Sequence, residues 1–321
     1  MLSRTTTPGM SFGLSPTNLN ILTDRSLSKG STERLRMLKL LERSVASVGE
    51  RMVLVAPPNA TGHEFFQNVE VDHQLRNALV RQMQRLRGDV YLQDSAISRQ
   101  QLISGRHETP EDERSWHLLM LDRGHEVTAC IRYLEHDTNA SVDSLRARSC
   151  PLAADAGWRH QFFDAVAEEL AGARRLGLRF AEIGGWAVAP GHRCTSEGLV
   201  LALAAYSLGR ISGGAFGLTT ATVRHASSTI LRRLGGTPLS SADGPLPAYF
   251  DPHYNCEMEL LRFDSRRPAT RFASLIESLR VQLSMVQVVA SQALSAIPIC
   301  LDTPAPAASL LSGDQLAAAA A

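Results

Sequence analysis

The stretch GGWAVAPGHRCTSEGLVLAL, residues 184–203, decides the fold of this chain. It has the pattern of a strand that stops at Pro190, a short polar loop, and an apolar helix that begins near Ser196. The first N–H groups of a helix have no partner inside it, and the helix dipole makes that end positive. Glycines in the loop would let a phosphate approach the backbone. The stretch predicts a site for a pyrophosphate or phosphopantetheine phosphate, with an ordinary strand-to-helix turn as the alternative.

Helix and strand patterns alternate on both sides of this stretch. The predicted strands cover 51–57, a hairpin of 117–122 and 126–136, and then 180–190, 216–221 and 255–264. The predicted helices begin near 31–33, run from Asp72 to Arg87, and then cover 158–177, 196–212, 222–236 and 271–294. This alternation predicts an α/β fold with a mixed sheet, preceded by extra N-terminal helices and followed by a C-terminal helix.

The two ends of the chain differ in composition from the rest. Residues 1–30 are rich in Ser, Thr, Pro and Gly without a helix or strand period, which predicts a disordered arm. Residues 299–321 are rich in Ala and Pro, which predicts a low-complexity tail. Residues 31–298 are therefore expected to form one domain.

Composition argues against several classes of protein. A net charge of +1 lacks the basic excess of a nucleic-acid binder. The five cysteines include no Cys-x-x-Cys pair, so we expect free thiols in a reducing cytosol and no metal site. The N-terminus has no apolar signal region, and no stretch reaches the roughly 18–20 apolar residues of a membrane span. We expect a cytoplasmic protein with no nucleic-acid partner and no membrane span.

The loop at 193–198 resembles the donor-binding motif of the GNAT superfamily of acyl-CoA N-acyltransferases, Gln/Arg-x-x-Gly-x-Gly/Ala. Arg193 stands first and Gly198 last, although Ser196 replaces the central glycine. The resemblance implies a GNAT-like fold and an acyl donor, either acyl-CoA or acyl-phosphopantetheine on an acyl carrier protein, with no tightly bound cofactor. It places the donor site on Trp186, Ala187, Val188, Arg193, Thr195, Ser196 and Gly198.

Two further stretches resemble the N-acyl amino acid synthase and acyl-homoserine-lactone (autoinducer) synthase branch of that superfamily. The strand TACIRYL places Arg132 where the family has an Arg, which could orient a carboxylate or form a structural salt bridge. The strand EIGGWAV keeps the family's acidic residue at Glu182, but two glycines replace its Ser-Arg pair. The identity of the acceptor therefore does not carry over. Paired glycines within a strand often mark a bulge or a close approach by a ligand.

Amide formation from a thioester needs a base for the amine, an oxyanion donor and an acid for the thiolate. The resemblance makes Glu182 the base, with pairing to Arg132 or Arg179 as the structural alternative, and makes backbone N–H groups of 186–188 the oxyanion donors. The strand-helix unit at 216–239 resembles a later GNAT unit, but Leu231 stands at its usual tyrosine. Tyr254, Cys256, His225 or water could supply the proton.

The sequence thus predicts an N-acyltransferase that moves an acyl group to an amine such as an amino acid. The alternative is a catalytically inactive GNAT-like module that binds an acyl-thioester or a protein partner; a filled cleft between the strands at 182–188 and 216–221 would favour it. The helices of 33–88 could roof an acyl chain, and Arg81, Arg85 and Arg87 could form a patch for a carrier protein. The apolar series of 275–290 predicts core or a homodimer face.

Overall fold

The computed structural model describes residues 39–46, 48–61, 64–224 and 226–295. The predicted arm at 1–30, the helix start at 31–33 and the tail at 299–321 lie outside these ranges, as does His225. The domain boundaries therefore stay predictions.

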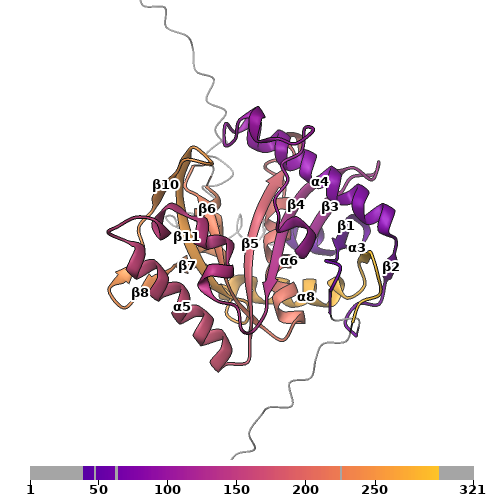
Figure 1. Cartoon of the computed structure of the whole chain (residues 1–321). Coiled ribbons are helices and arrows are strands. Elements are labelled where there is room, and N and C mark those ends of the chain that lie inside the picture. The colour runs from indigo at the N-terminus through magenta and orange to yellow at the C-terminus, as the bar shows by residue number, and fades with distance from the viewer. Residues whose placement is uncertain (1–38, 47, 62–63, 225, 296–321) are drawn as a thin grey trace, which may run out of the picture.

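The described part of the chain forms a ten-stranded mixed sheet with the order β10-β11-β6-β5-β4-β3-β1-β12-β2, and β7 also pairs with β11 (Figure 1). Neighbouring strands are parallel at β5/β6, β1/β12 and β12/β2, and antiparallel elsewhere. The strands are β1 (Met52–Val55), β2 (Val69–Val71), β3 (Trp116–Leu121), β4 (Val127–His136), β5 (Arg179–Val188), β6 (Ala215–Thr222), β7 (Thr237–Pro238), β10 (Tyr249–Asp251), β11 (Cys256–Asp264) and β12 (Gln287–Ala290). A small separate hairpin joins β8 (Ser240–Ser241) to β9 (Gly244–Pro245). The predicted mixed α/β sheet is confirmed.

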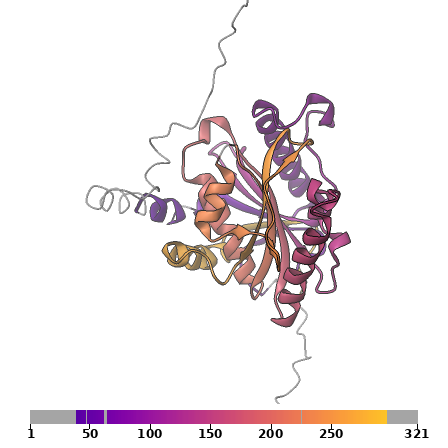
Figure 2. The same cartoon turned by 90° about the vertical axis from the view of Figure 1, so that its left-hand side faces the viewer.

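Helices cover both faces of the sheet. Figure 2 shows α4 and α5 on one side and α7 and α8 on the other, and α6 packs with α8 in the core of that second side. The α-helices are 39–46, α3 (Val48–Arg51), α4 (His73–Gln93), α5 (Arg159–Arg175), α6 (Glu197–Ile211), α7 (Ser227–Leu234) and α8 (Ala273–Leu283). The short 3-10 helices are η2 (Arg99–Gln101), η3 (Asp112–Arg114), η4 (Val142–Ser144), η5 (Arg146–Ser149), η6 (Pro151–Ala153), η7 (Pro190–His192) and η8 (Thr270–Phe272). No helix of the described ranges is long and apolar enough to cross a membrane.

Helix α4 begins where the sequence predicts but runs further. Asp72 caps it, and its carboxylate accepts hydrogen bonds from the N–H groups of Gln74 and Leu75. The predicted end at Arg87 and Gly88 is wrong, because the helix continues to Gln93. A Cβ on Gly88 would lie 3.2–3.3 Å from atoms of the 102–107 loop. The glycine therefore permits close packing of that loop rather than ending the helix.

The predicted final helix at 271–294 is also wrong in its second half. Helix α8 ends at Leu283, and Gln287–Ala290 form β12, which lies between β1 and β2 and is parallel to both. Val288 and Val289 are fully buried there. β-branched residues fit a buried strand well, and the place between two strands supplies the backbone partners. In α8, Leu275, Ile276, Leu279 and Leu283 pack in the core, which is one of the two predicted alternatives, whereas Val281 is exposed.

Candidate active site

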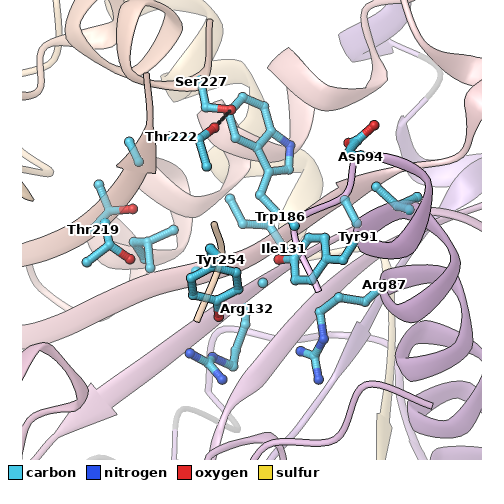
Figure 3. Close-up of a pocket in the computed structure, with 18 of the residues that line it drawn as sticks. Arg87, Tyr91, Asp94, Ile131, Arg132, Trp186, Thr219, Thr222, Ser227 and Tyr254 are labelled. Atoms are coloured by element: carbon cyan, nitrogen blue, oxygen red, sulfur yellow. Dashed lines mark hydrogen bonds between the residues drawn. The ribbon is translucent and has the colours of Figure 1, made fainter. Parts of the chain in front are cut away.

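A cleft opens where two parallel strands at the centre of the sheet separate. β5 and β6 pair from Arg179↔Ala215 to Ile183↔Thr219, but beyond this point each strand continues without pairing to the other. A cavity of about 1340 Å³ occupies the space between them. β5 and the end of α4 line one wall, while β6, α7 and β11 line the other (Figure 3). The cleft between these two strands is therefore open and not filled by side chains.

A bulge in β5 lies at the edge of this cleft. Gly184 pairs with Arg132 and Ala187 pairs with Cys130, so two β5 residues, Gly185 and Trp186, face one residue of β4. Gly185 has a φ of +61°, which favours glycine. The bulge expected from the paired glycines is confirmed.

The bulge also controls where the strand's N–H groups point. The N–H of Ala189 donates to Thr128 O on β4. Because successive N–H groups of a strand point to opposite edges, the N–H of Val188 points towards the cleft. β6 has already diverged at this level, so this N–H is free of strand pairing to β6. The Trp186 side chain projects into the same space (Figure 3).

The predicted donor-binding residues gather at one end of the cleft. Its lining includes Trp186, Ala187, Val188, Arg193, Thr195 and Gly198. Ser196 is not among the lining residues: its hydroxyl lies 2.5 Å from that of Ser44. A Cβ on Gly198 would lie 3.2 Å from Val188 Cγ2 and 3.4 Å from Trp186 Cζ2, so this glycine permits close contact between α6 and β5.

A buried carboxylate that the sequence analysis missed fixes the loop before α6. Glu197 accepts from Arg51 at 2.5 Å, from Thr128 Oγ1 at 3.2 Å and lies 3.1 Å from His192 Nδ1. It occupies the first turn of α6, where the helix dipole favours a negative charge. The cluster ties the N-terminal helices to the donor loop, and no local sequence signal pointed to it.

Arg132 lies in the opposite part of the cleft with much of its hydrogen-bonding capacity unused. Its Nη1 donates to Thr109 Oγ1 at 2.7 Å and lies 3.5 Å from Glu111 and 3.8 Å from Asp112. Within the described residues, Nε and Nη2 donate to nothing, although the side chain is 4% exposed. Burial lowers the pKa of Arg132, and the positive charges of Arg146 and Arg87 lower it further. The positive charge of this guanidinium therefore has no carboxylate oxygen closer than 3.5 Å.

Arg87, beside it, forms a close ion pair with Asp112, although its Nε has no hydrogen-bond partner among the described residues. It donates to both Asp112 oxygens, at 2.9 and 2.6 Å, and to the backbone oxygen of His107. Burial acts to lower the pKa of Arg87, but the bonds and charge of Asp112 raise it above the ordinary value. Arg87 therefore does not belong to the surface patch predicted from Arg81, Arg85 and Arg87, because it lies on the buried face of α4, whereas Arg81 and Arg85 are exposed.

Glu182 is held from three sides. His136 Nε2 lies 2.8 Å from Oε2, the N–H of Arg146 donates to Oε2 at 2.7 Å, and the N–H of Ala147 donates to Oε1 at 2.7 Å. The alternative pairing with Arg132 or Arg179 is wrong, since Arg132 lies near Glu111 and Asp112, and Arg179 pairs with Glu135. Two carboxylate oxygens offer about four acceptor positions, so one on Oε1 stays available. Glu182 lines the cleft and also anchors η5.

The ring of Tyr254 packs edge-on against that of Tyr91 on α4, with their centroids 6.0 Å apart (Figure 3). The Tyr254 hydroxyl accepts a hydrogen bond from Arg146 Nη2 at 3.2 Å, and the Arg146 Nη1 donates to Glu111 at 3.0 Å. Of the predicted proton donors, Tyr254 lines the cleft, Cys256 is buried outside its lining, and His225 lies outside the described residues. Within those residues no group of three or more His, Cys, Asp or Glu could hold a metal ion.

The cleft has a polar side and an apolar side. Glu182, Gly184 and Arg132 belong to the sheet face that α4 and α5 cover, whereas Ile131 and Ile183 belong to the α6 face. On the α6 face a recess of about 20 Å³ shares Ile131, Ile183, Thr219 and Leu231 with the cleft. Ala202, Ala205, Tyr206 and Phe263 also line it. Its volume suits about one small apolar group.

No family model and no curated protein matches this chain. Solved structures that it resembles include BjaI, a CoA-dependent acyl-homoserine lactone synthase, with a TM-score of 0.45 and 18% identity over 76% of this chain and 95% of BjaI. MesI, another such synthase, has a TM-score of 0.41 and 18% identity over 77% of this chain and 99% of MesI. FeeM, an N-acyl amino acid synthase from uncultured soil microbes, has a TM-score of 0.40 and 15% identity over 62% of this chain and 89% of FeeM. The likeness concerns the fold alone, and it falls on the synthases that the sequence motifs resemble.

Proposed function

We propose that this chain is an N-acyltransferase that moves an acyl group from acyl-CoA or an acyl carrier protein to an amine that bears a carboxylate. The observation that carries the proposal is the open cleft at the bulge of β5. A thioester carbonyl placed there would meet the N–H of Val188, which points into the cleft. The inactive-module alternative was expected to have a filled cleft, so the open one favours the transferase.

The two ends of the cleft suit the two substrates. The loop before α6 offers Arg193 and the helix N-terminus to the phosphate of the donor's pantetheine arm. The polar side offers Arg132, whose Nη2 donates to none of the described residues and suits a carboxylate of the acceptor. The apolar recess beside Ile183 suits part of the acyl chain. The donor thus approaches from the α6 end and the acceptor from the face of α4 and α5.

The proposed chemistry uses groups that line the cleft. The acceptor nitrogen attacks the thioester carbon, and the N–H of Val188 stabilises the oxyanion. Because Val188 follows Glu182 by six residues along β5, the proton that the nitrogen loses reaches the Glu182 carboxylate through water in the cleft. Collapse of the intermediate forms the amide and expels the thiolate, which takes a proton from water or from the Tyr254 hydroxyl.

The test is a screen for acyl transfer. Purified protein is incubated with acyl-CoA donors of two to sixteen carbons and with pools of amino acids, and thiol release and product mass are measured. Glu182→Gln should abolish transfer while retaining donor binding, and Arg148→Gln, which changes an exposed arginine outside the cleft lining, should leave transfer unchanged. Absence of transfer from every CoA donor and from matching acyl carrier proteins would overturn the proposal.

A further inference from the structure

The charged residues at the donor end of the cleft form a contact that bridges its mouth. Asp94, which caps the C-terminus of α4, has its carboxylate 3.0 Å from Arg193 Nη2 in the donor loop. Its backbone oxygen accepts a hydrogen bond from Arg224 Nη2 at 2.9 Å, and Arg224 follows β6 on the opposite wall. All three residues line the cleft. One acidic residue therefore engages two arginines from both sides of the opening.

We propose that Asp94 is a positioning residue that holds Arg193 and Arg224 at the mouth of the cleft and gives up Arg193 to the phosphate of the incoming donor. This role of Asp94 rests on the proposed function. Arg224 is then a second phosphate ligand, and Asp94 is the anion that competes with the phosphate. The shared ligand chemistry is a phosphate ester that adjoins a pantetheine arm. It is present in CoA and in the prosthetic group of a carrier protein.

Exposure makes the exchange feasible. The Arg193 side chain is 32% exposed and that of Asp94 is 19% exposed, so solvent weakens their attraction. A phosphate carries more charge than a carboxylate and can accept two parallel N–H bonds from one guanidinium. Arg224 is exposed as well, and its present acceptor is a neutral carbonyl. Both arginines can therefore exchange a weaker partner for a stronger one.

The local charge balance also favours an anion. Within the bridge itself, two arginines face the single carboxylate of Asp94, which leaves one positive charge in excess among these three residues. Asp94 stands at the C-terminus of α4, where the helix dipole disfavours a negative charge. Removing the Asp94 charge should therefore not destabilise α4. If Asp94 served only to stabilise the fold, removing its charge would lower the free energy of unfolding. The direction of the change in the free energy of unfolding therefore distinguishes a purely structural role from the proposed one.

The test measures binding of CoA, 4′-phosphopantetheine and pantetheine to the full chain by calorimetry. Asp94→Asn should tighten the Kd of CoA and of 4′-phosphopantetheine about two- to fivefold, the worth of an exposed ion pair, and leave pantetheine unchanged. Arg224→Gln should weaken the two phosphate ligands by a similar factor and again spare pantetheine. Asp143→Asn, which removes the exposed partner of Arg148 outside the cleft lining, is the matched control and should change nothing.

The outcomes separate this inference from the proposed function. Phosphate ligands that bind the wild type but are not tightened by Asp94→Asn overturn the competition. Equal changes for pantetheine and CoA overturn it too, because they indicate a general structural effect. If neither CoA nor 4′-phosphopantetheine binds wild type or Asp94→Asn, the proposed acyl-transfer function fails, and this inference fails with it.

Discussion

Replacing Arg132 with methionine should have little effect on folding and a large effect on recognition of the acceptor. The polar side of the cleft contains three guanidinium groups, from Arg87, Arg132 and Arg146, and the carboxylates of Glu111, Asp112 and Glu182, of which Glu182 is bonded to backbone N–H groups and His136 and to no arginine side chain. Arg87 and Arg146 each have a carboxylate at 3.0 Å or closer, whereas Arg132 approaches none closer than 3.5 Å. Removing Arg132 therefore leaves two matched ion pairs.

The expected energies follow from this pairing. Arg132→Met loses the hydrogen bond to Thr109, a loss of about 1–2 kcal/mol, and the end of repulsion from Arg87 and Arg146 offsets part of it. The free energy of unfolding should fall by less than about 2 kcal/mol. Arg87→Met removes an equally buried arginine but leaves the buried Asp112 carboxylate with no cation closer than Arg132 at 3.8 Å, which should cost about 3–5 kcal/mol. Urea unfolding of the two variants gives the comparison.

The same variant tests the role of Arg132 in binding. A buried hydrogen-bonded contact between a guanidinium and a carboxylate contributes about 1.5–3 kcal/mol, so Arg132→Met should raise KM for the accepted amino acid by about 10–150-fold. For the corresponding amine without its carboxylate, wild type and variant should show equal KM values, measured by thiol release. Equal losses for both acceptors would refute the carboxylate role. A stability loss as large as that of Arg87→Met would refute the charge reasoning.

Three further predictions concern pH, the apolar recess and the bulge. Burial lowers the pKa of His117 to about 4 from 6.5, so the unfolded chain binds a proton that the folded chain does not. Stability is therefore lost as the pH falls from about 6.5 towards 4, by a contribution on the order of 3 kcal/mol, and His117→Gln should remove that share of the loss in urea titrations. Ala205→Ile should fill the recess and lower kcat/KM for the longest donor used while sparing acetyl-CoA; equal losses for both donors in competition assays would exclude the recess. Gly185→Ala should reduce the free energy of unfolding by about 1–3 kcal/mol, because its φ is +61° and a Cβ would lie 3.1 Å from Arg87 Nη1. Gly191→Ala, at a position with open space, should cost less, and a reversed order would contradict the strain argument.

Local patterns predicted the elements around the cleft because local chemistry determines them. The hairpin of β3 and β4 follows from two apolar runs around a short turn. The pair of glycines in β5 predicted the bulge of that strand, since glycines inside a strand are otherwise unfavourable. The loop before α6 was found for the same reason: Pro190 and the start of an apolar run mark both of its ends.

Tertiary context decided what the sequence could not predict. The 287–290 stretch becomes a strand because β1 and β2 supply partners that lie far away in the sequence. Glu182 acquires its partners from η5, which no spacing around Glu182 indicates. Arg87 is different, because a signal existed: it follows Met83 by four residues and so lies on the apolar face of α4. Reading that spacing would have excluded Arg87 from a surface patch.

The bulge explains how one strand can serve both sides of the cleft. In a regular strand, Glu182, Gly184, Trp186 and Val188 would share one face. The extra residue at Gly185 reverses the alternation, so that Gly184 and Gly185 lie beside Arg132 and Arg87 while Trp186 and Val188 pack with the α6 side. The carboxylate of Glu182 is thereby kept with the polar groups, and Val188 with the donor loop. A single inserted residue thus places proposed acceptor and donor groups on opposite faces of the sheet, and they meet where β6 has moved away.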